Sequence, residues 1–517
     1  MTAIEMMDFF VASQPDAPAL SDEGRELSYR EVNSEAERLA SALRGIGVGE
    51  EDRVAIITLN RVEQLTLIYA TMKIGAVYVP INNKLAPPEI KYVLQNAGAK
   101  VLFAEEEPFR TVVDALEGLP QLRHYVLIDG KSGSGWIGWD DFIGESGASI
   151  EPLEYSPTRP VYQMYTSGTT GFPKGVVITQ QQLATFVVQA SLIPPQPPQG
   201  ACYLTVAPLF HAAALCSCVS ALCLGRSSHI VKEFNPLHFV ETIAARGISN
   251  TTVVPAMLQA ILATVPNLES YDFSCLEKIV YGASPITEDL LRKSMDVFDC
   301  DFQQGYGMTE LVAMVTALTA ADHRAALAGR PELLRSCGRP GPFTKLKIVD
   351  PETRVELARG EVGEIAIKST AMMECYGGMP EKTAEVIDGT WYYSGDGGYL
   401  DEEGYLYIKD RIKDMIITGG ENVYPAEVEN ALASHSAIAD VAVIGLPDDK
   451  FGSAVVAVAV AAENSSIPST EELIEFCRPL IASFKIPRRY EFVDELPRNA
   501  SGKLLKNKLR SDFAEGD

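Results

Sequence analysis

Short apolar runs and helix-like segments alternate through the first third of this 517-residue chain. Residues 53–59 form a strand-like run, a segment with helical spacing extends to Met72, and residues 76–81 form the next apolar run. A second pair follows, helix-like over 88–96 and strand-like over 101–104. Strands that alternate with helices at this spacing are typical of βαβ units, in which helices cover both faces of a mostly parallel sheet. We therefore predict an α/β fold.

The pattern changes further along the chain. A second alternating region from Tyr203 to about Phe302 predicts another sheet, and short strands with turn dipeptides over 343–409 predict a small β-rich subdomain. Beyond Arg411 a compact α+β pattern follows, with strand-like runs and one helix-like segment: 441–444, 454–460 and 470–480. We predict a domain boundary at 410–413, with a large N-terminal domain over 1–410 and a small C-terminal domain over 411–517.

Charge and composition exclude several classes of protein. The chain carries 44 basic and 69 acidic residues, a net charge of −25, which would repel nucleic acid and anionic membranes. If the protein binds a polyanionic substrate, local groups such as lysines or backbone N–H donors must bind it against this overall charge. Glu5 and Asp8 occur early, and no basic segment followed by an apolar run marks a targeting leader, so the cytoplasm is the expected location.

The longest apolar stretch and the cysteines both indicate a buried core. Residues 207–225 are interrupted by a proline, a histidine and serines, so they lack the unbroken length of a membrane span. Nine cysteines occur without a Cys-x-x-Cys pair, and several lie in apolar surroundings. We expect buried free thiols rather than disulfides or a metal site.

A glycine- and hydroxyl-rich segment over residues 165–175 carries the strongest chemical signal. Its glycines leave backbone N–H groups free to approach an anion, its hydroxyls can donate to phosphate oxygens, and Lys174 adds a positive charge. The segment differs from the Walker pattern, because Phe172 and Pro173 stand where Gly-Lys would follow Gly168. The sequence predicts a phosphate-binding loop rather than a flexible surface loop.

At this loop the sequence begins to resemble the adenylate-forming superfamily: acyl- and aryl-CoA synthetases, luciferases and the adenylation domains of peptide synthetases. It is most similar to fatty acyl- and aryl-CoA ligases, and the resemblance returns at separate, ordered motifs along the chain. It implies that ATP, with Mg²⁺, activates a carboxylic acid as its acyl adenylate, and that coenzyme A then takes the acyl group. By this resemblance Thr166 and Lys174 are catalytic, and the loop residues that hold the nucleotide are Thr166, Ser167, Gly168, Thr169, Thr170 and Lys174.

A second motif covers residues 304–310. Paired glycines let the backbone pass close to a ligand, while Thr309 and Glu310 supply the hard oxygens that suit magnesium. Without the resemblance this segment reads as a strand-end turn with a capping threonine. The resemblance implies that Glu310 is catalytic and helps hold the metal, and it assigns nucleotide contacts to Gln304, Gly305, Tyr306, Gly307, Met308 and Thr309, with Tyr306 beside the adenine.

A third motif, residues 393–396, places a carboxylate directly after a tight turn. An acidic side chain at such a position can accept both hydrogen bonds of a ribose diol; the plain alternative is a solvated turn carboxylate. The resemblance implies that Asp396 binds the ribose and that Arg411 is a second ribose contact. It adds three further nucleotide-binding positions: Ala283, Ser284 and Ile408.

The predicted domain boundary also carries a motif. The resemblance implies that Lys413 is a hinge about which a mobile C-terminal domain rotates, and that Gly419 and Gly420 face the pantetheine of coenzyme A. An exposed linker that never moves is the alternative. About 90 residues after the hinge, Lys503 follows a glycine, and the resemblance makes it the lysine of the adenylation step and a nucleotide contact.

His211 lies in a strongly apolar stretch, where a lone histidine is usually a satisfied core residue. In the family this position lines the acyl pocket and the thiol tunnel. Amino-acid-activating members keep an aspartate shortly afterwards, whereas this chain has alanines and a leucine over 212–215, which favours a neutral, apolar acyl group. The implied substrate-binding residues are His211, Ala212, Ala256, Tyr281, Gly282 and Gly307.

Several questions stay open at this level. A free-standing enzyme that loads a carrier protein is the main alternative to a coenzyme A ligase; a luciferase-type oxygenase and a non-enzymatic ATP sensor are two further classes. The acid can be fatty, cinnamate-like or benzoate-like, and the sequence does not distinguish these. It does not identify the coenzyme A phosphate contacts either. The oligomeric state is equally open, with a homodimer among the options.

Overall fold

The computed structural model divides the chain into two compact units. Unit 1 comprises Met1–Lys345 and Lys368–Tyr392, and unit 2 comprises Leu346–Ile367 and Tyr393–Asp517. Each unit is described by itself below. The structure describes residues 1–107, 113–116, 118–133, 135–144, 153–166, 173–198, 200–284, 286–418, 421–448, 452–462, 465–498 and 504–514.

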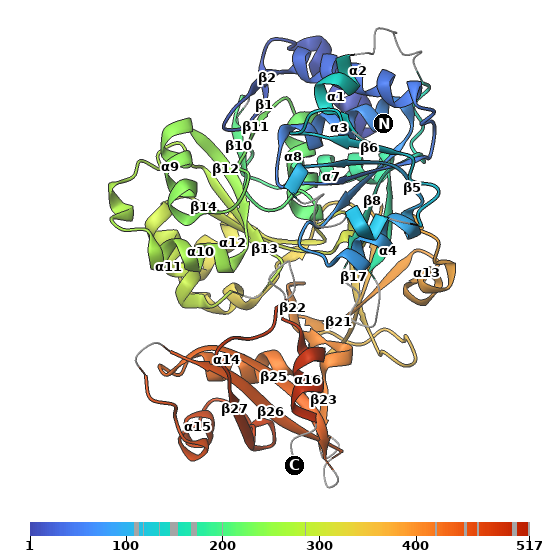
Figure 1. Ribbon diagram of the computed structural model, residues 1–517. Coiled ribbons are helices and arrows are strands. Elements are labelled where there is room, and N and C mark those ends of the chain that lie inside the picture. The colour runs from blue at the N-terminus through green and yellow to red at the C-terminus, as the bar shows by residue number, and fades with distance from the viewer. Residues whose placement is uncertain are drawn as a thin grey trace. The chain divides into compact units, whose positions relative to one another are not determined.

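Unit 1 contains two large sheets (Figure 1). The first has eight strands, mostly parallel, with antiparallel pairs at one edge. Its strands, in spatial order, are β19 (Cys375–Tyr376), β9 (Lys174–Thr179), β8 (Pro160–Thr166), β4 (Val77–Ile81), β3 (Arg53–Ile57), β5 (Ala99–Ala104), β6 (His124–Leu127) and β7 (Ile137–Gly138). The central strands β3 and β4 are almost wholly buried, as expected of parallel strands covered on both faces.

The second sheet has nine strands and is parallel over its central part. Its strands, in spatial order, are β16 (Arg339–Pro340), β15 (Thr316–Leu318), β14 (Asp301–Tyr306), β13 (Lys278–Gly282), β12 (Ile248–Val253), β10 (Cys202–Thr205), β11 (Ser227–Ile230), β1 (Pro18–Ser21) and β2 (Glu26–Ser28). The two alternating sequence regions therefore each form a sheet, as predicted.

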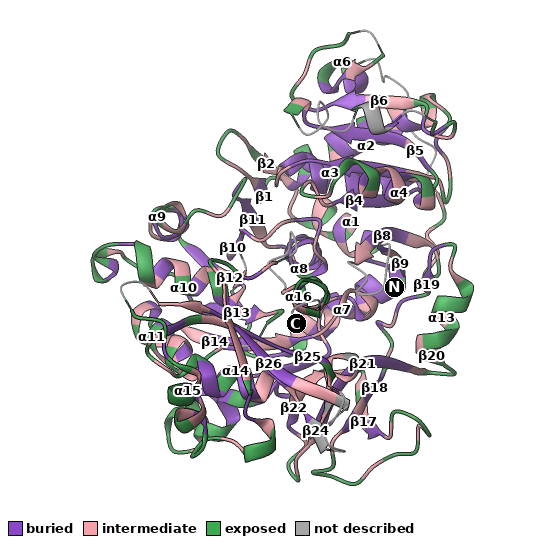
Figure 2. Ribbon diagram, turned by 60° about the horizontal axis from the view of Figure 1, so that its bottom comes forward, coloured by how far each residue is buried: buried purple, intermediate pink, exposed green. Residues whose placement is uncertain are grey.

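Helices pack between the sheets and around them. Helices α2 and α8 contact the nine-stranded sheet, α3 and α7 contact the eight-stranded sheet, and α1 contacts all four of these helices. The helices of unit 1 are α1 (Ala3–Ser13), α2 (Tyr29–Gly45), α3 (Val62–Ile74), α4 (Pro87–Ala97), α6 (Trp139–Gly144), α7 (Gln180–Leu192), α8 (Ala212–Cys223), α9 (Pro236–Arg246), α10 (Pro255–Thr264), α11 (Glu288–Phe298), α12 (Ala320–Leu327) and α13 (Pro380–Val386). Helix α13 has no buried residue and stands out as exposed in Figure 2.

Helix α3 is fully buried, and ion pairs stabilise its charged side chain Glu63. All of its 13 residues are buried. Its carboxylate Glu63 is paired with Arg25 at 3.0 Å and with Arg61 at 3.1 Å, which offsets the cost of removing the charge from water. The helix ends at Gly75, which adopts φ +74°; a Cβ there would lie 2.9 Å from a Leu153 methyl group.

Unit 2 begins with strands of a five-stranded sheet through which the division between the units passes. The strands of this sheet are β17 (Thr344–Val349), β18 (Gly363–Ser369), β21 (Trp391–Leu400), β22 (Leu406–Arg411) and β20 (Ile387–Asp388), the last of which belongs to unit 1. They form the predicted β-rich subdomain. The short 3-10 helix η5 (Ile412–Asp414) and the hairpin of β23 (Ile416–Thr418) and β24 (Glu421–Val423) follow directly.

A three-stranded sheet forms the centre of the C-terminal part of unit 2. Its strands are β25 (Ile438–Asp448), β26 (Gly452–Ala461) and β27 (Arg489–Phe492), and its helices are α14 (Pro425–Ala433), α15 (Thr470–Cys477) and α16 (Lys506–Ala514). Side chains of α14 and α15 pack into one apolar cluster, and Leu509 of α16 packs into another. Helix α15 ends three residues before the predicted Leu480, because Pro479 has no N–H to continue it.

The α/β fold class is confirmed by this architecture. The apolar stretch over 207–225 supplies α8, which is buried in unit 1. Across the part of the chain that the structure describes, no helix is long and apolar enough to cross a membrane. All nine cysteines are free thiols.

Candidate active site

The two ends of the predicted phosphate loop meet at the end of a β-hairpin. Thr166 is the last residue of β8 and Lys174 the first of β9, and the two are partners in the antiparallel register. Gly175 follows, where a Cβ would lie 2.5 Å from Nε2 of Gln163, so only glycine fits without a shift. The predicted nucleotide contacts Ser167, Gly168, Thr169 and Thr170 lie outside the described residues.

A tyrosine joins this loop to the second predicted motif. The hydroxyl of Tyr376 donates to Oε1 of Glu310 at 2.7 Å, and Nζ of Lys174 lies over the Tyr376 ring, 4.8 Å from its centroid. The backbone N–H of Met373 also donates to the carbonyl of Glu310 at 2.7 Å. The structure thus brings Lys174 and Glu310 to the same place, although 136 positions separate them in the chain.

Tyr376 is a residue that the motif analysis missed. It lies in the short edge strand β19, where it pairs with Val176 of β9. Two glycines follow it, and a Cβ on Gly377 would lie 2.7 Å from Nε2 of Gln163. That glycine pair was the only local feature of the sequence that pointed to Tyr376 as a site residue, because the contact with Glu310 depends on the fold.

Glycines also line the ends of the neighbouring strands β13 and β14. Gly282 and Gly305 are partners in the parallel register, and a Cβ on Gly282 would lie 2.3 Å from the Gly305 carbonyl oxygen. A Cβ on Gly307 would lie only 1.9 Å from the Ala313 carbonyl oxygen. Ligands of open α/β sheets bind at the carboxyl ends of strands, so these close approaches fall where a ligand is expected.

Backbone strain gathers at the same edge. Ala283, directly after β13, has φ +68°, and Val312 and Ala313, directly after η3 (Thr309–Leu311), have φ +52° and +76°. Residues with side chains rarely adopt this left-handed region, least of all a β-branched valine. Such strain, of the order of 1–3 kcal/mol each, clusters at functional sites.

Further predicted nucleotide contacts lie in β14 and in the segments that follow β13 and β14. Gln304 is in β14, and its Oε1 is buried without a hydrogen-bond partner among the described residues. Tyr306, at the end of β14, is 9% exposed. Ser284 is exposed, and Met308 and Thr309 are half-buried at the start of η3.

The predicted acyl-pocket residues are divided between core and surface. His211 occupies the N-cap position of α8 without a side-chain capping hydrogen bond, and burial lowers the pKa of its imidazole from 6.5 to about 4; its Nε2 has no partner in the described part of the chain. Ala212 is buried and Ala256 is exposed in the first turn of α10. Tyr281 is 1% exposed, with its hydroxyl 2.9 Å from Nε2 of His323, so it lies in the core.

In unit 2 the structure brings the two predicted ribose contacts together. Asp396 of β21 and Arg411 of β22 are partners in the antiparallel register, and Nε of Arg411 lies 2.7 Å from Oδ1 of Asp396. The preceding Gly395 has φ +70°, and its N–H donates to Oε1 of Glu364 at 2.8 Å. Burial raises the pKa of the Glu364 carboxyl, a supporting residue that the motif analysis did not include.

Ile408, the third predicted contact on these strands, pairs with Gly398. The backbone of the predicted hinge residue Lys413 lies in η5. Gly419, Gly420 and Lys503 lie outside the described residues. Their assignment stays a prediction.

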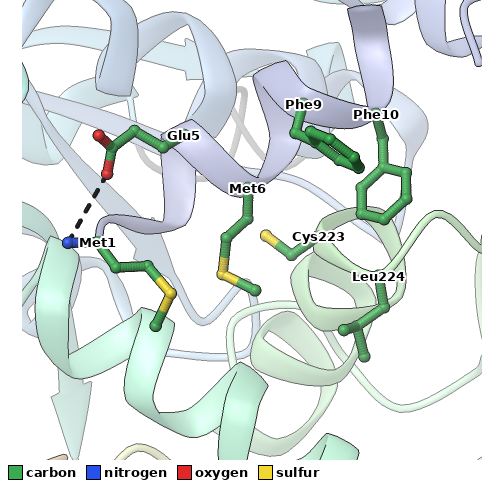
Figure 3. A pocket seen from close by; sticks show the side chains of 7 residues that line it. All are labelled: Met1, Glu5, Met6, Phe9, Phe10, Cys223 and Leu224. Atoms are coloured by element: carbon green, nitrogen blue, oxygen red, sulfur yellow. Dashed lines mark ion pairs between the residues drawn. The ribbon is translucent and has the colours of Figure 1, made fainter. Parts of the chain in front are cut away.

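A shallow apolar pocket lies elsewhere, between α1 and the end of α8 (Figure 3). Its lining includes Phe9, Phe10 and Leu224, and the N-terminal amine of Met1 lies 3.9 Å from Oε2 of Glu5. None of the predicted site residues lines it.

Family models match most of the chain. A model of the AMP-binding enzyme matches residues 8–377, and a model of the AMP-binding enzyme C-terminal domain matches residues 427–503. The chain belongs to the AMP-binding enzyme family. The matched segments contain Lys174, Glu310 and Tyr376 in the first model and Lys503 in the second.

Individual members of this family are similar over nearly their full length. The fatty acid–acyl-carrier-protein ligase ScoC of Streptomyces coeruleorubidus is 38% identical, over 99% of this chain and 96% of that protein. A feruloyl-CoA synthase of Amycolatopsis is 36% identical, over 96% of each. The structure of o-succinylbenzoate CoA synthetase from Bacillus subtilis, in complex with its acyl-adenylate intermediate, superposes with a TM-score of 0.84 at 28% identity, covering 98% of this chain and 97% of that one.

These comparisons confirm the predicted family and the predicted class of enzyme, an AMP-forming acid–thiol ligase. The roles of individual residues, the hinge at Lys413 and the domain boundary at 410–413 stay predictions.

Proposed function

We propose that this member of the AMP-binding enzyme family activates a neutral, apolar carboxylic acid with ATP and transfers the acyl group to coenzyme A. The observation that carries the proposal is the contact chain Lys174–Tyr376–Glu310, which joins the ends of the phosphate loop to a carboxylate at the edge of the second sheet. A cation and an acidic group are thereby held together where strands end in closely packed glycines. This arrangement suits a nucleoside triphosphate with its metal ion.

In the first half-reaction an oxygen of the substrate carboxylate attacks the α-phosphorus of ATP. The bond from that phosphorus to the bridging oxygen breaks, and pyrophosphate leaves with the electron pair. Lys174 and the proposed Lys503 stabilise the negative charge on these oxygens by position, without proton transfer. The carboxylate of Glu310 and the hydroxyl of Thr309 fit Mg²⁺, a hard cation that would neutralise phosphate charge in this site.

In the second half-reaction the thiolate of coenzyme A attacks the carbonyl carbon of the acyl adenylate. The thioester forms and AMP leaves with the oxygen that came from the acid. Asp396 accepts hydrogen bonds from the ribose hydroxyls in this proposal, and the Arg411 guanidinium, 2.7 Å away, orients that carboxylate.

The proposed acid follows from the charge of the pocket. With a pKa of about 4 the His211 imidazole is neutral at pH 7, and the Ala212–Cys223 helix that follows it has no charged side chain. A substrate ammonium would be left without a partner there, and the nearby ammonium of Lys84 would repel it, which is costly in a buried site. Fatty and aryl acids therefore fit better than amino acids.

A carrier protein is the second candidate acceptor. It is favoured by one observation, the similarity to a fatty acid–acyl-carrier-protein ligase over 99% of this chain. In both cases the attacking group is a pantetheine thiol, so the acyl-adenylate chemistry is the same. The two acceptors differ in the group attached to the pantetheine, a nucleotide or a protein, which the surface of the enzyme must recognise.

We also propose the cytoplasm as the working compartment. ATP and coenzyme A are both available there, and the nine cysteines are free thiols, which are typical of a reducing environment.

The test is a panel of fatty, cinnamate-type, benzoate-type and amino acids, with release of pyrophosphate measured for each. We expect release with at least one neutral acid, dependent on Mg²⁺, and little with amino acids. Consumption of free coenzyme A together with AMP formation would support the main proposal, whereas acylation of an added carrier protein without consumption of coenzyme A would support the second candidate. ATP binding without pyrophosphate release from any acid would overturn both.

A further inference from the structure

Two cations one turn apart on the C-terminal helix contact both sides of the proposed hinge. Nζ of Lys506 lies 3.7 Å from Oδ2 of Asp410, before Lys413, and Nη2 of Arg510 lies 2.7 Å from Oδ1 of Asp414, after it. Both cations are on α16, which begins three residues after Lys503 (Figure 1). Residues four apart lie on the same face of a helix, so one face of α16 meets the hinge segment.

Asp410 makes a second contact across the hinge. Its Oδ2 accepts the N–H of Ala426, in the first turn of α14, at 3.0 Å, and its Oδ1 accepts the N–H of Arg411 at 2.7 Å. The side chain is 10% exposed. Asp410 therefore holds two groups that follow Lys413 in the chain, the ammonium of Lys506 and the N-terminus of α14.

The remaining contacts of this cluster lie entirely on the C-terminal side of the hinge. Lys506 also contacts Oε1 of Glu429 at 2.8 Å, and Glu429 accepts the N–H of Val443 at 2.7 Å. These residues, with Asp414 and Arg510, would move as one body in a rotation about Lys413. Of these contacts, the two that Asp410 makes with Lys506 and Ala426 span the hinge, so they must break in such a rotation.

We infer that Asp410 is a positioning residue: with Lys506 it forms a latch that holds the hinge in one orientation and so sets when the Lys503 loop leaves the site. The inference rests on the proposed function in assigning roles to Lys413 and Lys503. The latch itself stands on contacts within unit 2.

The surroundings make the latch an ionic one. Burial acts to lower the pKa of Lys506, but the charges of Glu429 and Asp410 outweigh it and raise that pKa, so the ammonium stays protonated. Burial raises the pKa of Glu429, against the opposing effect of Lys506. Arg510 and Asp414 form a second ion pair against the same segment.

A first experiment does not depend on enzyme activity. Hydrogen exchange is followed in peptides that cover residues 411–426 for the parent and for two matched amide variants, Asp410→Asn and Glu429→Gln. Asp410→Asn removes the charge that holds Lys506 across the hinge, and we expect exchange in these peptides to rise about tenfold, as for the loss of one charge-assisted contact. Glu429→Gln removes a Lys506 partner on the C-terminal side only, and exchange should stay within about twofold of the parent.

A second experiment measures the two half-reactions separately: pyrophosphate release, and conversion of supplied acyl adenylate to thioester. Asp410→Asn should change the ratio of the two rates by about fivefold or more, whereas Glu429→Gln should change both rates by one common factor. A merely structural role of Asp410 would also lower both rates together.

The inference is overturned if exchange over 411–426 is unchanged in Asp410→Asn, if both variants raise it equally, or if the ratio of the half-reactions does not move. If the parent releases no pyrophosphate with any acid, the proposed function fails, while the exchange comparison still decides whether the latch exists.

Discussion

Tyr376 links two groups whose charges are opposite. Its hydroxyl holds one oxygen of Glu310, and its ring lies under the ammonium of Lys174. A neutral residue between a cation and a carboxylate keeps the two from forming a direct ion pair. In the proposed function both charges then stay available for the triphosphate and its metal ion, as a preorganised site requires.

Replacing Tyr376 with phenylalanine separates these two roles. The Tyr376→Phe variant keeps the ring and loses the hydrogen bond to a charged acceptor, worth roughly 1.5–3 kcal/mol. We expect a Mg²⁺ titration of pyrophosphate release to shift to about tenfold higher concentration, with the melting temperature lowered by no more than a few degrees. Tyr271→Phe, at a tyrosine outside the site, serves as the control. Overlapping titrations of Tyr376→Phe and the parent would remove Tyr376 from the site.

The lowered pKa of the His211 imidazole predicts that the stability of the protein depends on pH. Its pKa is 6.5 in the unfolded chain and about 4 in the folded one, so between these values the unfolded chain binds a proton that the folded one does not. The stabilisation is complete above pH 6.5 and is lost as the pH falls toward 4. At pH 5 the loss is about 2 kcal/mol.

The measurement is urea unfolding of the parent and of His211→Asn at pH 7 and pH 5. The loss of unfolding free energy on going to pH 5 should be about 2 kcal/mol smaller in the variant. Burial also lowers the pKa of His229 to about 4, but that residue is present in both proteins and drops out of the difference. Equal losses in the two proteins would show that His211 is protonated normally in the fold.

At the scale of elements, two glycines at the end of β14 differ in the space that surrounds their Cα atoms. A Cβ on Gly307 would collide with the Ala313 carbonyl at 1.9 Å, whereas a Cβ on Gly305 would lie 3.8 Å from the Met314 side chain, an ordinary contact. Gly307→Ala should therefore lower the melting temperature by roughly 5 °C or more, through displaced backbone. Gly305→Ala should leave it within about 1 °C.

Gly305→Ala then tests the site without disturbing the fold. If the space above Gly305 belongs to the substrates, the variant should bind ATP or the acid several-fold more weakly at an unchanged melting temperature. Parental affinities for both would place the substrates elsewhere.

Local patterns predicted the elements well, and contacts between distant segments poorly. The alternating runs of the first third became β3, α3, β4, α4 and β5, because burial on both faces of a parallel sheet leaves a strong apolar signal in each run. Motifs with several glycines also fell at the ends of β8 and β14. These features are set within about ten residues of sequence.

Tyr376 and Glu364 show what local patterns leave out. Tyr376 acts through Glu310, 66 residues away, and Glu364 through Gly395, 31 residues away. A single tyrosine or glutamate is common on any surface, and its role comes only from the partner that the fold supplies. The partner of Tyr281 is equally non-local: its hydroxyl lies 2.9 Å from Nε2 of His323, 42 residues away, and its assignment to the acyl pocket stays a prediction.

At the scale of the whole molecule, Lys503 tests whether the C-terminal domain takes part in one half-reaction only. Removing one preorganised cation typically costs about 10²–10³ in rate, so Lys503→Ala should nearly abolish pyrophosphate release. Conversion of supplied acyl adenylate and coenzyme A to the thioester should continue at close to the parental rate, because the lysine has left the site. Equal loss of both half-reactions in a folded variant would contradict the two-orientation mechanism.

The central claim is that the acid attacks the α-phosphorus of ATP, and isotope transfer tests it most directly. The enzyme is supplied with ATP, Mg²⁺, coenzyme A and an active acid whose carboxylate carries ¹⁸O, and the AMP produced is examined by mass spectrometry. The proposed mechanism predicts one ¹⁸O atom in each AMP, together with formation of the acyl-CoA thioester. Unlabelled AMP, or formation of ADP with the label in inorganic phosphate, would contradict it.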